Sequence, residues 1–537
     1  MSRRLRLRRW QRDALELLDK RQPRDFMVTA TPGAGKTTFG LVAMLRFLKD
    51  HPHARLVVVT PSRSLKTQWA GAAAEFGLEL VDDWDGGRLP ADAHGIVVTY
   101  AGVGSRPADI ARVAMEGGAL IDEIHHAGTE RTWGDGLAAA LNGAERRIAL
   151  SGTPWRGDTN PIPFVHYDAA GVAVPDFAYG YAEALADGGV VRPVFFPRLG
   201  GNMEWVSAGG ELQGATFDDP LDRKGASQRL RTALSPDGGW LRETLAQAHD
   251  RLMTVRAEDP HAGGIVFAMD QEHARGVAKL LHQITGEAPV LAISDEADAQ
   301  NRLAAFATSA EPWAVCVRYA SEGYDAPRLR VGVYATNVIA PLFWNQAVGR
   351  IVRWRKEAGT QQAAWMFIPD DVRLRELALS IKEQRTHVLR PPADAEEQDE
   401  REQATQLESE QLSLFAAVHS EAEGELRGDR GDAETDPWFV PPMAAPDVED
   451  PALEVELPPP PGGAAGDDPN AAATPPRAQL RQRNAEKVTL ISTLTGLGHR
   501  EINARLNRSS GITQVGQATK PQLQRRLAEA DKWLRAL

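Results

Sequence analysis

The fold and the site of this chain are indicated first by one stretch, Ala30-Thr31-Pro32-Gly33-Ala34-Gly35-Lys36-Thr37. It follows an apolar run at 26–30 and precedes an amphipathic pattern at 37–49, which predicts a buried strand that turns into a helix. Glycines let backbone N–H groups wrap a phosphate at a helix N-terminus, where the helix dipole favours negative charge. A lysine that reaches the terminal phosphates and a threonine that binds Mg²⁺ complete such a loop. The predicted nucleotide contacts are Thr31, Gly33, Ala34, Gly35, Lys36 and Thr37.

Two acidic residues end a second apolar strand, in the sequence Ala-Leu-Ile-Asp-Glu-Ile-His-His at 119–126. Asp122 suits an Mg²⁺ contact, and Glu123 suits the residue that orients and deprotonates an attacking water. Each motif alone has a simpler explanation, because Ala30 stands where a strict phosphate loop has glycine and two acids can simply end a strand in a solvated turn. Together the two motifs predict an NTPase. We expect His125 to couple hydrolysis to movement of the protein.

Strand-like and helix-like patterns alternate along residues 1–390. Continuous Val/Ile-rich runs separated by amphipathic helices are typical of parallel sheets covered on both faces. The expected strands form two sets, at 26–30, 55–60, 95–100, 118–123 and 146–151, and at 263–268, 288–293, 313–318, 331–336 and 362–368. We therefore predict an α/β fold with two tandem parallel-sheet domains, residues 1–170 and 171–390.

The net charge of −12 is distributed unevenly. Residues 391–475 hold 3 Lys or Arg against 22 Asp or Glu, and 13 of the 35 prolines. Such a segment buries too little apolar surface to offset its ordering entropy, so 391–476 is expected to be a disordered acidic Pro-rich linker. Residues 477–537 hold 12 Lys or Arg against 4 Asp or Glu in helical patterns. They predict a small basic all-α module that suits a phosphate backbone, with a protein-interaction module as the alternative.

Composition excludes several classes of protein. One cysteine, Cys316, excludes a disulfide framework and a multi-thiolate metal site. No apolar stretch approaches the ~18 residues of a membrane span, and the basic start has no signal-peptide core. We expect a cytoplasmic protein that does not enter a membrane.

The sequence resembles the superfamily 2 DEAD/DEAH-box helicases, in the branch of type III restriction motors and excision-repair helicases. The resemblance covers residues 5–370 and lies in motifs that follow the family's order. They are Arg9-Trp10-Gln11, Thr60-Pro61-Ser62-Arg63, Val98-Thr99-Tyr100, Asp122-Glu123-Ile124-His125, Ser151-Gly152-Thr153-Pro154, Ile265-Val266-Phe267, Ser321-Glu322-Gly323-Tyr324-Asp325-Ala326-Pro327 and Gln346-Ala347-Val348-Gly349-Arg350-Ile351-Val352-Arg353. The resemblance implies RecA-like domains, ATP and Mg²⁺ as cofactors, and DNA as the partner.

The resemblance also implies roles for single residues. Gln11 is expected to read adenine, and Gly323 and Asp325 to line the ATP site. Arg350 and Arg353 are expected to face the γ-phosphate from the second domain, so that hydrolysis depends on closure of the two domains. Other roles implied by the resemblance are catalysis by Gln346 together with Lys36 and Glu123, Mg²⁺ binding by Thr37 and Asp122, coupling by His125, Ser151 and Thr153, and nucleic-acid contacts by Pro61, Arg63, Thr99, Tyr100 and Ser321.

Two regions fall outside this resemblance. The segment 198–260 matches no motif, and no carboxylate–carboxylate–lysine nuclease pattern indicates a restriction endonuclease. Within the acidic linker, Gln411-Leu412-Ser413-Leu414-Phe415 resembles the peptide by which bacterial polymerases and repair proteins bind the sliding clamp. Its apolar anchors in a solvated chain suit a hydrophobic pocket. The alternative is a helical extension of the core.

Taken together, the motifs predict an ATP-dependent DNA helicase or translocase that the sliding clamp recruits. Two alternatives stay open. One is an RNA helicase with the same motor, and the other is an ATPase switch that binds DNA without unwinding it.

Overall fold

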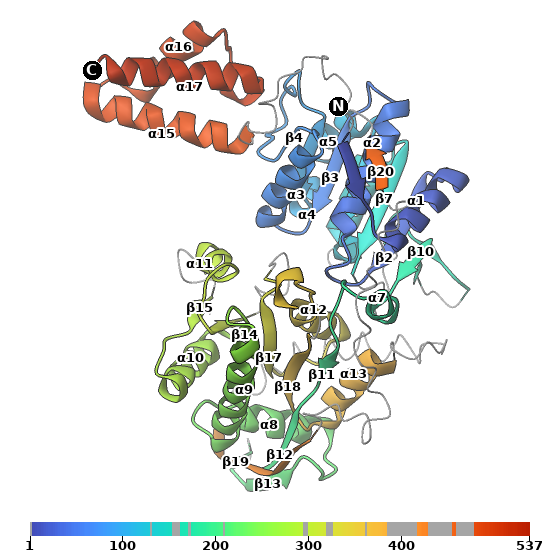
Figure 1. Ribbon diagram of the computed structural model, residues 1–537, viewed down its shortest axis with the longest axis vertical. Helices are drawn as coiled ribbons and strands as arrows, with labels where there is room; N and C mark the ends of the chain where they lie inside the picture. The colour runs from blue at the N-terminus through green and yellow to red at the C-terminus, as the bar shows by residue number, and fades with distance from the viewer. Residues whose placement is uncertain are drawn as a thin grey trace.

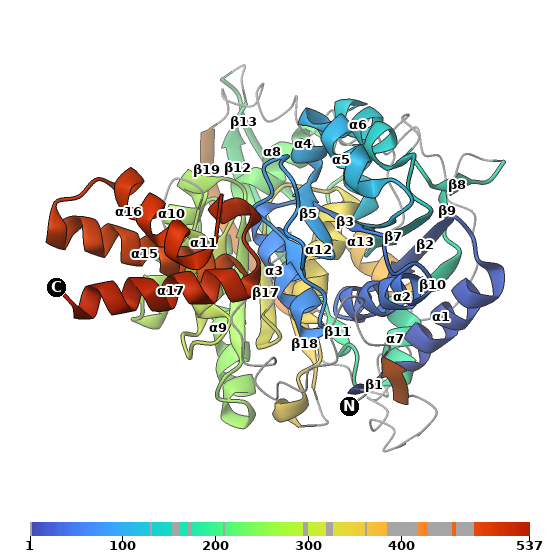
Figure 2. The same cartoon turned by 90° about the horizontal axis from the view of Figure 1, so that it is seen from above.

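The computed structural model describes residues 3–128, 131–152, 162–169, 173–207, 210–293, 299–317, 326–359, 362–383, 416–427, 454–457 and 477–537. Figure 1 shows two α/β lobes, one above the other, with a helical module that projects beside the N-terminal lobe. Seen from above in Figure 2, this module extends to one side of both lobes. In the described part of the chain, no helix combines the length and apolarity that crossing a membrane requires.

The N-terminal lobe is built on a parallel sheet with the strand order β10-β2-β7-β6-β3-β5-β4. Its strands are β2 (Asp25–Ala30), β3 (Leu56–Thr60), β4 (Leu80–Val81), β5 (Gly95–Thr99), β6 (Gly118–Asp122), β7 (Arg146–Ser151) and β10 (Phe177–Tyr179). The five predicted strands are all present. The predicted domain boundary at residue 170 is wrong, because β10 pairs with β2 and so belongs to the first sheet.

Apolar side chains on both faces of each strand bury this sheet between two layers of helices. Val58 faces one side together with buried residues of α1 (Arg9–Arg21), α2 (Lys36–Asp50) and α3 (Arg63–Glu75). Its neighbours Val57 and Val59 face the other side. The helices on that side are α4 (Tyr100–Ser105), α5 (Pro107–Ala114) and α6 (Arg131–Leu141). The carboxyl ends of the strands therefore meet at one edge, where loops can form a site.

The second lobe also contains the predicted parallel strands. They are β14 (Gly263–Ala268), β15 (Val290–Ala292), β16 (Trp313–Cys316), β17 (Leu329–Ala335) and β18 (Ala364–Pro369), with β11 (Val194–Phe195) beside β18. Helices of this lobe are α10 (Gln271–Thr285), α11 (Ala299–Phe306), α12 (Pro341–Ile351) and α13 (Val372–Glu383). The two parallel sheets confirm the predicted α/β fold class.

The unassigned segment 198–260 extends the second sheet. It forms β12 (Arg198–Val206), β13 (Leu212–Thr216), α8 (Arg223–Ala233) and α9 (Gly239–Glu258). β12 pairs in parallel with β18 at one end and antiparallel with β13 at the other. Side chains along β12 alternate between buried and half-buried, which is the pattern of a strand with one face on the core.

Two strands lie inside the range expected to be a disordered linker. β19 (Ala416–Arg427) pairs antiparallel with β12 from Val206 opposite Ala416 to Arg198 opposite Arg427. β20 (Glu454–Leu457) pairs antiparallel with the N-terminal strand β1 (Arg3–Arg6). The expectation of disorder over 391–476 is corrected for these two segments. Composition missed them because main-chain hydrogen bonds to an edge strand need no apolar side chains.

The C-terminal residues form the predicted helices α15 (Arg477–Thr495), α16 (His499–Ser510) and α17 (Lys520–Arg535). Val488, Ile491, Ile502 and Leu506 form part of their small apolar core. The buried Arg526 is held by side-chain amide oxygens from the other two helices, namely those of Asn484, Asn503 and Asn507.

Basic residues at one end of this module bind acidic residues around β4 of the N-terminal lobe. Arg477 Nη2 donates to Asp92 Oδ1 at 2.6 Å, and the backbone N–H of Lys520 donates to Asp92 Oδ2 at 2.9 Å. The Lys520 ammonium also lies 2.5 Å from Glu79 Oε2. Part of the module's positive charge therefore attaches the module to the lobe.

We expect Asp92→Ala to loosen the attachment of the module, because Arg477 loses one of its acceptors and the Lys520 N–H loses its acceptor, at a cost of about 1–3 kcal/mol. Small-angle X-ray scattering should then record a larger radius of gyration. Asp82→Ala is the matched control, since Asp82 belongs to the same acidic region but accepts a hydrogen bond at 3.2 Å from Thr67 of its own lobe. An unchanged radius of gyration for Asp92→Ala would contradict the docking contact.

Candidate nucleotide site

The glycine-containing loop lies where the sequence predicts it, between β2 and the N-terminus of α2. Gly33 and Gly35 have φ values of +82° and +91°, a conformation that other L residues rarely adopt. The N–H of Thr31 donates to the carbonyl of Tyr179 at 2.9 Å, so the loop is also bonded to β10. Lys36 and Thr37 are the first two residues of α2.

Side chains at the start of α1 donate hydrogen bonds to successive carbonyl oxygens of this loop. The pairs are Arg8 Nη1 to Gly33 O at 2.7 Å, Trp10 Nε1 to Ala34 O at 3.0 Å, and Gln11 Nε2 to Gly35 O at 2.8 Å. In a trans peptide the N–H points away from the C=O. These bonds therefore orient the N–H groups of Gly35 and Lys36 toward the opposite side, where a phosphate can bind.

Gln11 uses its side chain for contacts inside the protein in this structure, and its role in reading adenine stays a prediction. Its side-chain oxygen accepts from the N–H of Arg8 at 2.8 Å while its amide nitrogen binds the loop. The side chain is only 3% exposed, so both of its polar ends are used inside the protein. Arg8 was missed by the sequence analysis. The available signal was the three-residue spacing of Arg8 and Gln11, which is that of a helix N-cap and its N3 residue.

Lys36 and Glu123 form an ion pair beneath the loop. Lys36 Nζ lies 3.4 Å from Glu123 Oε1, and the backbone N–H of Gly152 donates to Glu123 Oε2 at 3.0 Å. Burial alone would raise the pKa of Glu123, but the charges of Lys36 and His125 lower it to about 2. Gly152 was not singled out from the sequence, although it lies within the predicted coupling motif.

Asp122 is buried next to this pair, and a tryptophan fixes its carboxylate. The indole N–H of Trp69, from α3, donates to Asp122 Oδ2 at 2.8 Å. Burial and then the charge of Glu123 raise the pKa of Asp122 to about 6, against the lowering effect of the indole. A nearby cation would offset both effects. The oxygen donors of Asp122 and Thr37 are also the ligand type that Mg²⁺ prefers, so these residues fit the predicted metal contact.

Tyr100 lies under the site and not on a nucleic-acid surface. Its side chain is 1% exposed, and its hydroxyl donates to the carbonyls of Asp122 at 2.9 Å and Glu123 at 3.2 Å. Burial and the two carboxylates raise its pKa, so the phenol stays a neutral donor. The prediction that Tyr100 contacts nucleic acid is therefore wrong. Its position directly after β5 places it against the carboxyl end of β6 instead.

The other residues predicted to contact nucleic acid lie at the same edge of the sheet. Arg63 is exposed at the first position of α3, and Pro61 is half-buried just before it. Thr99 ends β5, and its hydroxyl accepts from the N–H of Gly102 at 3.1 Å as the cap of α4. Ser321, Gly323 and Asp325 lie outside the described residues, as do Thr153 and the segment 411–415.

The predicted coupling residues His125 and Ser151 are brought together. His125 Nδ1 lies 3.1 Å from Ser151 Oγ, and both side chains are buried. His125 Nδ1 is also 3.6 Å from Glu123 Oε2. The end of β7 is thus connected to the predicted catalytic carboxylate through a histidine and through the N–H of Gly152.

The second lobe contacts the loop through α12 and the residues that follow it. A Cβ atom added to Gly349 would lie 2.6 Å from Pro32 Cγ, and one added to Gly33 would lie 3.3 Å from Arg353 Cγ. Arg350 is 8% exposed on the same helix, and Gln346 is half-buried on it. Of the residues predicted to act from the second domain, Arg353 therefore lies against the glycine loop of the first.

The sequence of this chain is similar to known proteins. Residues 4–156 match the family model described as type III restriction enzyme, res subunit, which confirms the predicted resemblance to the superfamily 2 helicases for the N-terminal lobe. An uncharacterized protein of Mycobacterium tuberculosis is 45% identical over 395 residues, which are 72% of this chain. The chain spans 65% of the length of that relative.

Two solved structures are similar at low sequence identity. A fragment of a putative HsdR subunit of a type I restriction enzyme from Vibrio vulnificus has a TM-score of 0.49 and 17% identity, over 69% of this chain and 65% of that chain. Dbp5 of S. cerevisiae, bound to RNA and ADP BeF3, has a TM-score of 0.45 and 15% identity, over 75% of this chain and 93% of that chain.

We predict that Trp69→Phe destabilises the protein in a pH-dependent way. The pKa of Asp122 is about 6 in the folded protein and 3.8 in the unfolded chain. The folded protein is therefore less stable when Asp122 is ionised, above about pH 6, than when it is protonated. The hydrogen bond from the Trp69 indole to the carboxylate offsets part of this loss of stability. Loss of the donor should cost about 1–3 kcal/mol at pH 7.5 and less at pH 5.0, where Asp122 is protonated. Urea denaturation at the two pH values measures the difference.

Trp10→Phe is the control for this prediction, because the Trp10 indole donates to an uncharged carbonyl and its loss should cost the same at both pH values. Equal costs of Trp69→Phe at pH 7.5 and 5.0 would show that the indole does not act on the Asp122 charge.

Proposed function

Because residues 4–156 match the family model of the type III restriction enzyme res subunit, we propose that this protein is an ATP-dependent DNA helicase or translocase. The observation that carries the proposal is the meeting of Lys36, Glu123 and Arg353 at one loop, with Arg353 supplied by the other lobe. A lysine, an acid and an arginine at a phosphate loop are the groups that nucleotide hydrolysis needs.

The ion pair of Lys36 and Glu123 suggests how binding of ATP prepares the base. While Lys36 lies beside Glu123, the low pKa of Glu123 makes it a poor proton acceptor. ATP draws Lys36 toward its phosphates, so Glu123 loses its cationic partner and its pKa rises. The N–H of Gly152 keeps the carboxylate oriented toward the attacking water. Glu123 thus becomes an effective proton acceptor only when nucleotide is bound.

The second lobe supplies the remaining charge. Arg350 and Arg353 stabilise the transferring phosphoryl group, and Gln346 on the same helix orients the attacking water. Gly323 and Asp325 complete the ATP site. Asp122 and Thr37 would hold an Mg²⁺ ion, which would supply positive charge to the phosphates. Opening and closing of the lobes follows hydrolysis through His125, Ser151 and Thr153.

Nucleic acid is proposed to cross the edge of the sheet where β3 and β5 end. These strands are neighbours, with Thr60 opposite Thr99, so Pro61, Arg63 and Thr99 lie along one edge, and Ser321 contacts the strand from the other lobe. The C-terminal module holds DNA beside this path. Its basic residues outside the docking contact include the exposed Arg483, Arg500, Arg508 and Arg525. DNA is chosen over RNA on the family match.

A panel of nucleic acids tests the proposal. ATP hydrolysis should be stimulated by single-stranded or forked DNA more than by RNA of the same length, and a strand-displacement assay should detect unwinding. Stimulation by RNA alone would favour an RNA helicase. Stimulation by DNA with neither unwinding nor displacement of a bound roadblock would favour an ATPase switch.

Glu123→Gln should abolish turnover and retain ATP binding. The amide keeps the shape of the side chain but cannot accept the proton of the attacking water, so we expect kcat to fall by ~10²-fold or more. Stopped-flow hydrolysis and binding of a fluorescent nucleotide measure the two effects. Glu145→Gln, at the N-terminal end of β7 and thus the opposite edge of the sheet, should change neither. Normal turnover by Glu123→Gln would remove Glu123 from the mechanism.

The segment Gln411, Leu412, Ser413, Leu414 and Phe415 is proposed to bind the bacterial sliding clamp. Replacing Leu414 and Phe415 with alanine removes both apolar anchors and should abolish capture of the protein on immobilised clamp. The matched control replaces Trp438 and Phe439, which are apolar residues of the same acidic region. Undiminished capture of the Leu414/Phe415 variant would refute this part of the proposal.

A further inference from the structure

Residues 177–192, called the connector below, join the two lobes and bond to both halves of the nucleotide site. The connector comprises β10, α7 (Tyr181–Asp187) and residues 188–192. At its first end, Tyr179 accepts a hydrogen bond from the N–H of Thr31 in the glycine loop. At its second end, Val191 forms a β-bridge with Arg353. The N–H of Arg192 donates to Val352 O at 2.7 Å, alongside this bridge.

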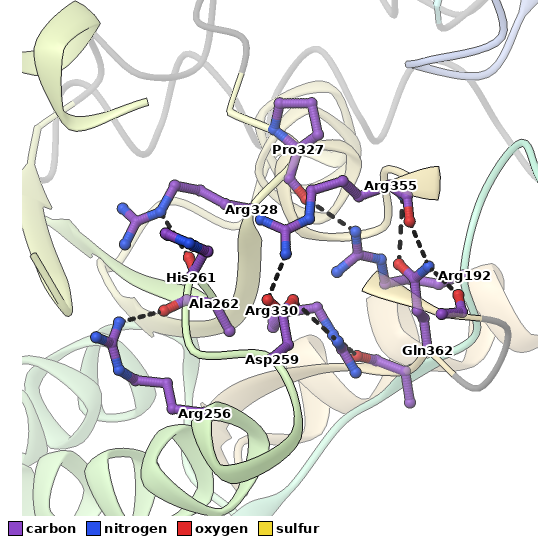
Figure 3. Close-up of polar contacts among 12 residues, drawn as sticks. Arg192, Arg256, Asp259, His261, Ala262, Pro327, Arg328, Arg330, Arg355 and Gln362 are labelled. Carbon is purple, nitrogen blue, oxygen red and sulfur yellow. Dashed lines mark hydrogen bonds and ion pairs between the residues drawn. The ribbon is translucent and has the colours of Figure 1, made fainter. Parts of the chain in front are cut away.

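The side chain of Arg192 extends this second attachment. Its guanidinium donates to the carbonyls of Pro327 at 2.8 Å, Leu329 at 3.3 Å and Arg353. The residue is 0% exposed, and Figure 3 shows it between Pro327 and the Arg355–Gln362 pair. A planar fork with five N–H groups can bind several carbonyls at once, which a lysine ammonium cannot do with the same geometry.

The chain on both sides of these carbonyls is also fixed. Arg355 is paired with Asp259, and the Gln362 amide donates to the carbonyls of Arg355 at 2.6 Å and Gly359 at 2.7 Å. Arg330 Nη1 lies 3.7 Å from the other oxygen of Asp259. Figure 3 shows this buried cluster at the end of α9. Within the cluster, Arg192 is the side chain that reaches the backbone of Arg353.

We propose that Arg192 is a positioning residue for Arg353. It fixes the main chain of Arg353 relative to residues 327–329, which begin at the last residue of the predicted motif at 321–327. It also fixes Arg353 relative to the connector, which is bonded to the glycine loop. The position of the Arg353 main chain, and with it the distance between its side chain and a γ-phosphate, is thereby fixed relative to the glycine loop. This inference rests on the proposed function, in which Arg353 stabilises the transferring phosphoryl group.

Arg192→Lys tests the inference, because it keeps the buried charge and removes the fork. A displaced arginine no longer meets the transition state, so we expect kcat for nucleic-acid-stimulated ATP hydrolysis to fall ~10-fold or more. The KM for ATP and the affinity for fluorescent nucleotide should change by less than about twofold, because the glycine loop that binds the ground state is intact.

Arg229→Lys is the matched control. Arg229 is 2% exposed and also binds carbonyls, those of Thr216 at 2.5 Å and Asp219 at 2.8 Å. It belongs to α8 and lies outside both the connector and residues 327–329. Both variants should lower the thermal unfolding midpoint, and only Arg192→Lys should lower kcat at a temperature where both are folded. Equal losses of kcat in the two variants, or an unchanged kcat in Arg192→Lys, would overturn the positioning role. A wild-type protein without ATPase activity would instead overturn the proposed function on which it rests.

Discussion

The hydrogen bonds from Arg8, Trp10 and Gln11 to the glycine loop are the interactions on which the site depends. A loop with two residues at positive φ has a large conformational entropy when it is free, and its N–H groups bind phosphate only if they converge. The start of α1 supplies that order from outside the loop. The same indole of Trp10 stacks on Tyr179, whose carbonyl binds Thr31. The loop is therefore held on both sides by aromatic packing and main-chain bonds.

The charged side chains behind the loop are also held by hydrogen bonds. Lys36, Glu123 and Asp122 lie close together, and each has a defined neutral donor or acceptor: the Ala30 carbonyl for Lys36, the Gly152 N–H for Glu123 and the Trp69 indole for Asp122. Neutral partners fix the geometry of a buried charge without neutralising it. The three ionisable groups consequently remain able to respond to a polyanionic ligand and a divalent cation.

Much of the fold could be predicted because its strands are long apolar runs with local signals. The run at 55–60 corresponds to Leu56–Thr60, and that at 146–151 to the whole of β7. β10 and β19 could not be predicted, because Phe177–Tyr179 is too short to show a period and Ala416–Arg427 is polar. Both strands exist through pairing with partners far away in sequence. Propensity and periodicity depend on residues that are close in sequence, so neither can predict pairing between distant strands.

The sequence identified many residues of the candidate site but not the partners that they contact. Gln11 was recognised, but an amide can bind a base edge or a carbonyl equally well, and only the fold shows its bond to the Gly35 carbonyl. Tyr100 was assigned to a surface although it lies beneath Asp122. Trp69 has no spacing signal at all, because its indole meets a carboxylate 53 positions later.

The pairing of β1 with β20 has a consequence for synthesis of the chain. Arg3–Arg6 are translated before their partner strand, Glu454–Leu457, which is made about 450 residues later. At 5–20 residues per second, that interval is roughly 20–90 s. The sheet of the N-terminal lobe can fold within it, but the strand that leads into Arg8 gains its pairing only after the second lobe has been made. Completion of the first lobe thus depends on a segment that is translated after the second lobe.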